Sequence, residues 1–188
     1  MTLYSVALFL HIVGALGLFV ALGLEWTSLL HLRRATTAEQ AREWLKLLGL
    51  VRRVGPASLA AILLPGLYMA ATVWGGRAWI GVGLAAMLLL PPLGALNGLR
   101  LAAIGREVAA ASGLLSPGLG ARLRHPLLWV SIQTRAAIAL GIVFLMTVKP
   151  DLAGALLTIG TAIILGLAST APAWVRARAL PAGAPHGD

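Results

Sequence analysis

Long stretches without charged side chains alternate with polar connections along the chain. Four stretches contain no Asp, Glu, Lys or Arg, and a fifth, 126–148, contains only Arg135. A transmembrane helix needs about 20 consecutive apolar residues, so each stretch is long enough to cross a bilayer. The pattern predicts an all-α, polytopic membrane bundle with five transmembrane helices, at about 4–31, 54–75, 78–104, 126–148 and 152–174.

The segments between these helices differ in length and polarity. The first, 32–53, mixes basic residues with leucines, which predicts a short amphipathic helix on the membrane surface, capped by Thr36 or Thr37 with Glu39 in its first turn. The second, about 104–125, carries Ser-Gly and Ser-Pro-Gly turn signals. The connections at 75–77 and 149–151 are tight, so the flanking helices should be antiparallel neighbours. We expect 1–178 to form one transmembrane domain and 179–188, rich in Pro, Gly and Ala, to be a disordered tail.

Composition and charge agree with a membrane location and predict its orientation. Hydrophobic residues make up 59% of the chain and charged residues 11%, against about 25% charged in soluble domains. Of the 15 basic residues, twelve lie in 32–53, 100–124 and 176–178, while Arg77 and Lys149 lie on the opposite side. The positive-inside rule then places the N-terminus outside and the C-terminus in the cytoplasm. Ala, Leu, Gly and Arg are abundant while Lys is rare, which favours a bacterial source. The membrane is then expected to be the bacterial inner (plasma) membrane.

Several function classes lack their sequence signatures. The chain has no cysteine, which excludes disulfides, Cys-ligated metal sites and thiol nucleophiles. Hydrolase, kinase and dinucleotide-binding motifs are absent, so we expect no catalytic residues and favour a non-enzymatic role. Topology accounts for the basic residues, so no nucleic-acid partner is expected. Copper transport gains little support, because the methionines form no repeated motif (Met69, Met87 and Met146).

His11 lies inside the first predicted helix, about 10 Å below the outer surface at 1.5 Å per residue. An ionisable residue inside a span is a functional hypothesis by default. A neutral imidazole can ligate a haem iron or copper. The alternative, which we favour, is a structural His hydrogen-bonded to a neighbouring helix, with Gly14 and Gly17 allowing close approach.

Glu25 and Arg135 are the candidate charged pair of the interior. Glu25 follows His11 by 14 residues, about four turns, so both lie on one helix face with Gly14, Leu18 and Ala21. Arg135 lies about 20 Å from the outer end of its helix and needs an anionic partner or a route to the surface. We predict a structural Glu25–Arg135 ion pair. A haem propionate is the alternative partner of Arg135.

His31 and His125 lie at the predicted cytoplasmic ends of the first and fourth helices. Their common depth would suit bis-His haem ligation, with nearby arginines for the propionates (Arg33, Arg34, Arg122 and Arg124). The favoured alternative is that His and Arg here are ordinary residues of the inner membrane surface.

Three segments carry a family resemblance: Leu10-His11-Ile12-Val13-Gly14-Ala15, Gly66-Leu67-Tyr68-Met69 and the run 141–151. With the spacing of the spans, they resemble a family of predicted bacterial integral membrane proteins of unknown function. The first segment is also similar to copper-resistance-D-like proteins and HemJ-like protoporphyrinogen oxidases, some of which bind haem b. The resemblance implies a haem-ligand role for His11 alone, because the lysine that HemJ-like enzymes use inside a later helix has no counterpart in the third span.

Three functions follow as hypotheses. The first is a non-catalytic membrane bundle, as a homodimer or as a subunit of a larger membrane complex. The second is a b-type haem-binding redox protein, with His11 as axial ligand and Arg135 as anchor for an anionic group. The third is a small-solute or metal transporter that uses a helix break at Pro91-Pro92.

Overall fold

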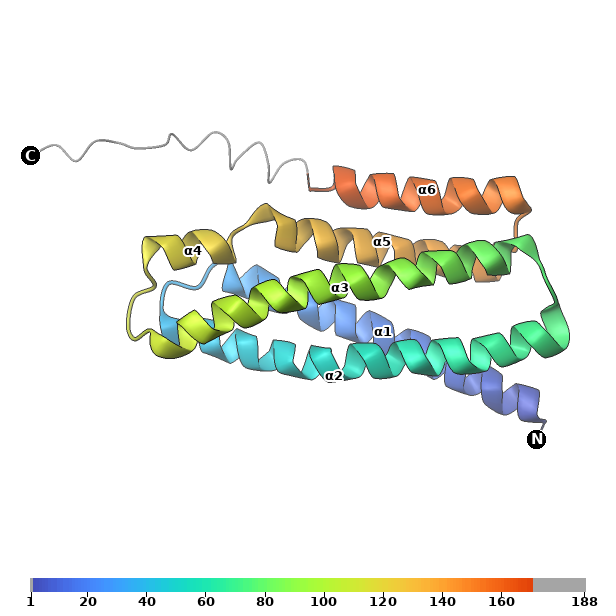
Figure 1. The fold of residues 1–188 in the computed structure, drawn as a ribbon, viewed down its shortest axis with the longest axis horizontal. Coiled ribbons are helices and arrows are strands. Elements are labelled where there is room, and N and C mark those ends of the chain that lie inside the picture. Colours follow the sequence, from blue (N-terminus) through green and yellow to red (C-terminus); the bar gives the residue numbers. More distant parts are fainter. Residues whose placement is uncertain (1, 171–188) are drawn as a thin grey trace, which may run out of the picture.

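The protein is built from helices packed side by side along one long axis (Figure 1). The computed structural model describes residues 2–170, and every regular element in that range is helical. The elements are α1 (Leu3–Leu32), α2 (Ala38–Met69), the π-helical η1 (Ala70–Trp74), α3 (Ala78–Ala110), α4 (Pro117–Leu123), α5 (Pro126–Val148) and α6 (Leu152–Ala168). In this range α1 packs most extensively on α2, while α5 packs on α3 and α6.

Four helical segments are long and apolar enough to cross a membrane: Leu3–Leu32, Ala38–Trp74, Ala78–Ala110 and Pro117–Val148. The apolar α6 has 17 residues and is shorter than a typical span. The predicted fifth span, 152–174, ends outside the described residues, as do the end of the predicted domain and the predicted tail at 179–188. The all-α class is therefore confirmed for the described chain, whereas the number of spans and their orientation stay predictions.

The prediction of a separate surface helix at 32–53 is wrong. Thr37 caps a helix as expected, its hydroxyl accepting the amide of Gln40 at 3.3 Å. That helix, however, continues for 32 residues into the apolar segment, through Pro56 and Pro65. Each proline removes one backbone donor, and long membrane-type helices tolerate this loss when they are packed against neighbours.

The second long connection is also more helical than predicted. α3 runs to Ala110, beyond the expected end at 104, and passes through Pro91 and Pro92 without interruption. The short α4 follows, capped by the Ser116 hydroxyl. The tight connections are as predicted, since Lys149 ends α5 in the left-handed conformation (φ 54°) and the Asp151 carboxylate caps α6.

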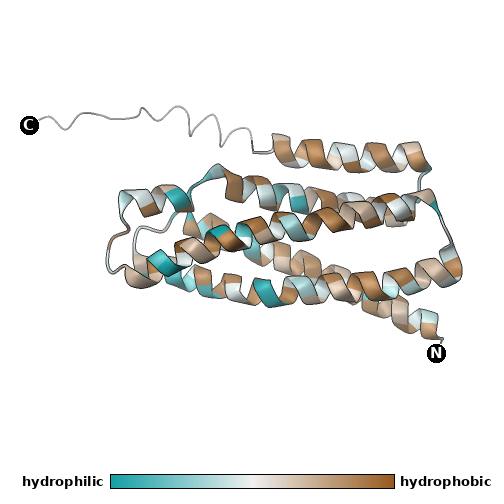
Figure 2. Cartoon of the chain, viewed as in Figure 1, coloured by the Kyte–Doolittle hydropathy of each residue, from teal (hydrophilic) through white to brown (hydrophobic). Residues whose placement is uncertain are grey.

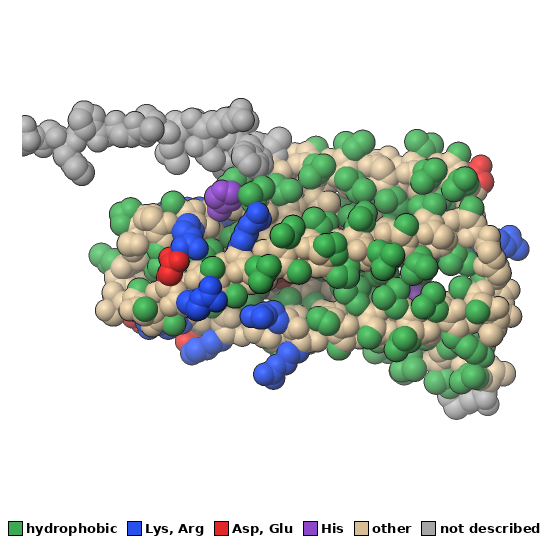
Figure 3. All heavy atoms as spheres, viewed as in Figure 1, with side chains coloured by type: hydrophobic (Ala, Val, Ile, Leu, Met, Phe, Trp, Pro, Cys, Tyr) green, Lys and Arg blue, Asp and Glu red, His purple; other side chains and the backbone are tan. Residues whose placement is uncertain are grey.

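Polar and apolar residues separate along the bundle axis. Hydrophilic positions gather at the end that carries α4, and apolar positions cover the remainder of the helices (Figure 2). The space-filling view shows basic side chains at that same end and hydrophobic side chains over most of the visible surface (Figure 3). Exposed apolar residues include Leu16, Leu64, Leu99 and Leu157, each more than 60% exposed. Such an extensive apolar exterior is typical of a lipid-facing or protein-covered surface.

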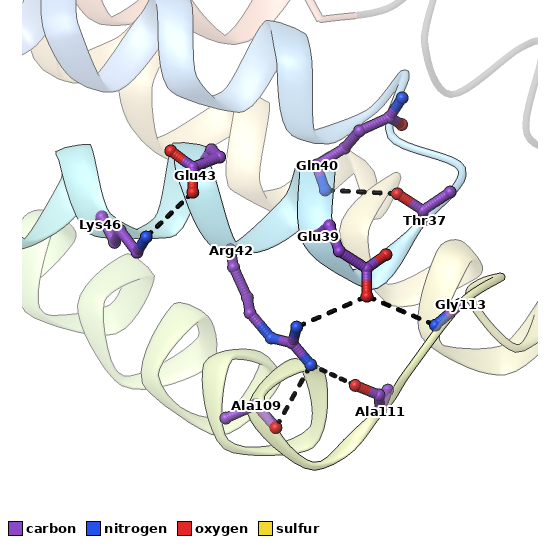
Figure 4. Close-up of polar contacts among 9 residues, drawn as sticks. All are labelled: Thr37, Glu39, Gln40, Arg42, Glu43, Lys46, Ala109, Ala111 and Gly113. Atoms are coloured by element: carbon purple, nitrogen blue, oxygen red, sulfur yellow. Dashed lines mark hydrogen bonds and ion pairs between the residues drawn. The ribbon is translucent and has the colours of Figure 1, made fainter.

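The two loops at the charged end are joined by a set of polar contacts that we call the loop clasp, residues 36–42 and 109–115 (Figure 4). Ala38 N–H donates to the Gly113 carbonyl and Leu115 N–H to the Thr36 carbonyl, both at 2.9 Å. The Arg42 guanidinium donates to the carbonyls of Ala109 and Ala111. The clasp therefore fixes the start of α2 against the end of α3.

Glu39 supplies the carboxylate of the loop clasp. It contacts Arg42 at 3.6 Å and the Gly113 amide at 3.5 Å. Its own backbone amide at the start of α2 is the main cause that holds the pKa of the Glu39 carboxyl below its ordinary value of 4.5, and the Gly113 amide adds to this effect. The Glu39 side chain is 59% exposed to solvent.

Candidate functional site

The buried face of α1 brings two candidate centres into the bundle. His11, Gly14, Leu18, Ala21 and Glu25 are all buried, as the helical spacing predicted. His11 meets α2 and α5 near the end of the bundle that carries the N-terminus. Glu25 meets α3 and α5 about four turns further along.

The His11 imidazole is held between α2 and α5. Its Nδ1 lies 2.8 Å from the Ile62 carbonyl oxygen, and its Nε2 lies 3.4 Å from Met146 Sδ. The carbonyl has only lone pairs, so the hydrogen of this contact belongs to Nδ1. In the neutral ring, Nε2 then carries a lone pair and no hydrogen, and the thioether sulfur beside it has no hydrogen to donate.

A cavity of about 70 Å³ adjoins the imidazole, between α2, α3 and α5. Its wall includes His11, Gly66, Trp79, Met87 and Met146. A second cavity of about 30 Å³ shares His11, Met87 and Met146. Met87 therefore lines the same two cavities as the His11–Met146 pair, an arrangement that sequence spacing did not reveal.

Glycines permit the close packing that places His11 there. A Cβ on Gly14 would lie 2.8–2.9 Å from backbone atoms of Ala61 and Ile62, so α1 and α2 approach each other closely at this point. A Cβ on Gly66 would lie 3.1 Å from two atoms of the imidazole ring. The small residues next to His11 thus bring the Ile62 carbonyl within hydrogen-bond reach of Nδ1, as interfaces of small residues do in membrane bundles.

The second centre is a buried charged network between α1, α3 and α5. The structure brings Glu25 and Arg135 together, with Arg135 Nη2 donating to Glu25 Oε1. Asn97 of α3 donates from Nδ2 to the same carboxylate oxygen at 3.2 Å and to the Leu128 carbonyl at 3.1 Å. The charged side chains are only 10% and 6% exposed, and Asn97 is fully buried. Three helices are therefore cross-linked through one carboxylate.

Some atoms of this region lack a partner among the described residues. They are Asn97 Oδ1, Arg135 Nε, Thr134 Oγ1 and Trp129 Nε1. Internal waters commonly satisfy such groups in buried polar networks. A Cβ on Gly94 would lie 3.2 Å from Arg135 Nη1, so the guanidinium lies directly against α3.

The other two histidines have local structural partners. His31 stacks on Trp44, with ring centroids 3.9 Å apart and planes within 4°. His125 is exposed and caps α5, its Nδ1 accepting the Leu127 amide at 3.3 Å. Of the arginines expected beside them, Arg122 pairs with Glu107, and Arg33 lies over the Trp129 ring.

A haem does not fit the residues around His11. His11 Nε2, the ring nitrogen left to ligate an iron, is already in contact with Met146 Sδ at 3.4 Å. Arg135, the expected propionate partner, is engaged by Glu25. The described residues also hold no group of three or more His, Cys, Asp or Glu side chains placed to bind a metal.

Sequence reasoning missed Asn97, Met87 and Met146 as parts of these centres. Asn97 carried a signal, because a polar amide inside a predicted span generally hydrogen-bonds to another helix. The two methionines carried no such signal, since only the rotation of α3 and α5 brings them to His11.

Comparison with known proteins adds no assignment, because no family model, curated protein or solved structure matches the chain.

Proposed function

We propose that the chain is a non-catalytic bundle of the bacterial inner membrane that acts as a homodimer or as a subunit of a larger membrane complex. It has five spans, with the N-terminus outside and the C-terminus in the cytoplasm. The four long apolar segments and the apolar α6 support this arrangement. The basic residues concentrated at the α4 end support a cytoplasmic location for that end (Figure 3).

The proposal rests on the charged side chains buried inside the bundle, which cross-link its helices. Asn97 and Arg135, from two other helices, both donate to Glu25, and none of the three lines the cavity beside His11. A charged group that serves a reaction needs access to its substrate, whereas these side chains are at most 10% exposed. Their arrangement supports a role in holding α1, α3 and α5 together.

The apolar exterior offers surface that lipid or a further protein chain can cover. Large apolar side chains are exposed over α1, α3, α5 and α6. Lipid covers such surfaces in a monomer, and further protein chains cover part of them in a complex.

The test is purification of the tagged chain from its own membranes in a mild detergent. The proposal predicts a particle larger than one chain with its micelle, containing a second copy or a stoichiometric partner. A Glu25→Met, Arg135→Met double variant keeps similar side-chain volume and should retain this particle, because replacing a buried ion pair by apolar residues is often tolerated.

Two results would contradict the proposal. One is a chain that is monomeric in mild detergent and yields no cross-linked neighbour in intact membranes. The other is a double variant that remains folded and assembled but loses the cellular phenotype of the wild type, which would give the charged pair a role beyond structure.

A further inference from the structure

The His11–Met146 contact brings together two electron-pair donors without a hydrogen between them. Nδ1 donates to the Ile62 carbonyl at 2.8 Å, which leaves neutral Nε2 with a lone pair, and this nitrogen lies 3.4 Å from Met146 Sδ. A thioether accepts hydrogen bonds weakly and never donates them. A second proton on the ring would create a hydrogen bond, but it would place a full charge among the apolar residues that line the cavity.

We propose that His11 and Met146, with Met87 as third ligand, bind a soft monovalent cation of the Cu(I) type. An imidazole nitrogen and thioether sulfurs are donors that suit soft metals, in contrast to Mg²⁺ and Ca²⁺, which prefer oxygen. The proposal concerns the residues around the cavity and does not depend on the number of spans or on the oligomeric state.

The distance between the two donors suits simultaneous ligation. With metal–nitrogen and metal–sulfur bonds of about 2.0 and 2.3 Å, a separation of 3.4 Å corresponds to an angle of about 100° at the metal. This angle is compatible with three- or four-coordinate geometry, so neither donor atom has to move far. Met87 lines both cavities next to this pair, and its flexible side chain can direct a second thioether to the same point.

The charge balance of the cavity favours a monovalent ion over a divalent one. None of the described side chains that line either cavity is a carboxylate. A Zn²⁺ ion held by one imidazole and two thioethers would keep both positive charges in an apolar interior, whereas Cu(I) would keep one. Burial of uncompensated charge is costly, so the same ligands discriminate against divalent metals.

The imidazole is already oriented as in established metal sites. Metal-ligating histidines generally donate the second ring N–H to a carbonyl or carboxylate, which fixes the tautomer and the ring plane. The Ile62 carbonyl does this for His11. Gly66 leaves room for the ring, since a Cβ there would lie 3.1 Å from Nδ1 and Cε1.

The experiment is anaerobic titration of the full-length chain in mild detergent with Cu(I), in competition with a chromophoric Cu(I) chelator. Ag(I) serves as the redox-inert second probe. We expect one ion per chain. Met146→Leu and Met87→Leu should each weaken binding by at least about tenfold, and His11→Gln should abolish it. Met69→Leu is the matched control, because it removes a buried thioether that does not line either cavity, and it should leave the affinity unchanged.

X-ray absorption of the Cu(I)-loaded wild type gives an answer even if a variant fails to fold. We expect one nitrogen neighbour at about 2.0 Å and sulfur neighbours at about 2.3 Å. The proposal is overturned if the wild type binds no Cu(I) or Ag(I), or if the spectrum lacks sulfur neighbours. It is equally overturned if Met146→Leu binds like Met69→Leu, or if Zn²⁺ displaces Cu(I) from the same ligands.

Discussion

Removal of the Glu25 charge should destabilise the bundle more than any comparable charge removal at its surface. Glu25→Gln keeps the size of the side chain and one acceptor oxygen, so it isolates the loss of the carboxylate charge. Arg135 is then left as an uncompensated cation whose side chain is only 10% exposed. Breaking a buried pair in this way costs about 3–5 kcal/mol of unfolding free energy.

The chain supplies a matched control in Glu43, which pairs with Lys46 at 2.9 Å. Those side chains are 69% and 73% exposed, and exposed ion pairs contribute about 0–1 kcal/mol. Glu43→Gln should therefore change stability by less than about 1 kcal/mol. The predicted difference between the two variants follows from burial alone, because both substitutions are chemically identical.

The assay is reversible unfolding in mixed micelles with a rising fraction of denaturing detergent, followed by helical circular dichroism. The Glu25→Met, Arg135→Met double variant should recover most of the stability that Glu25→Gln loses, because it removes both charges together. Equal stabilities for Glu25→Gln and Glu43→Gln would refute the reasoning. A double variant no more stable than Glu25→Gln would also contradict it.

Three further predictions concern packing, pH and colour. Gly14→Ala should cost about 1–3 kcal/mol of unfolding free energy through overpacking, because the new Cβ would lie 2.8 Å from the backbone of α2. Gly23→Ala on the same helix is the control: its Cβ meets nothing within 4 Å, so it should not lower the unfolding free energy. In thermal unfolding, the wild type should be more stable than Glu39→Gln above pH 4.5, and this advantage should shrink as the pH falls below that value. The reason is that the pKa of the Glu39 carboxyl is lowered in the folded state, so its protonation removes stability. An advantage independent of pH would contradict this assignment. The purified chain should show no Soret band after expression with added haem, because Met146 covers His11 Nε2 and Glu25 engages Arg135. A Soret band that His11→Ala abolishes in folded protein would contradict that conclusion.

The charged pair could be predicted because the energetics of the interior leave few alternatives. An arginine deep in an apolar stretch needs an anion, and Glu25 is the acidic residue that shares the buried face of α1 with His11. The third member, Asn97, depends on how α3 is rotated relative to α1 and α5. Sequence periodicity does not determine that rotation in α3, because apolar residues occupy both its buried and its exposed positions.

The boundaries of α2 could not be predicted for a different reason. The change from polar to apolar composition near Val54 marks a change of surroundings, not an end of the helix. Gly55-Pro56 looks like a terminator, yet the helix continues because packing against α1 outweighs the loss of one backbone hydrogen bond. Likewise, the environment of His11 depends on which α2 residues lie opposite Gly14, and one of them, Ile62, is 51 residues from His11 along the chain.

Accessibility labelling tests most directly whether the bundle spans the membrane with its charged end in the cytoplasm. The chain has no cysteine, so single substitutions can be labelled without background. Gly76→Cys and Ser112→Cys place thiols at exposed positions at opposite ends of α3. In intact spheroplasts, a membrane-impermeant maleimide should label the Gly76→Cys variant, and it should label the Ser112→Cys variant only after permeabilisation. Labelling of both variants from the same side, or of Ser112→Cys alone, would contradict the account.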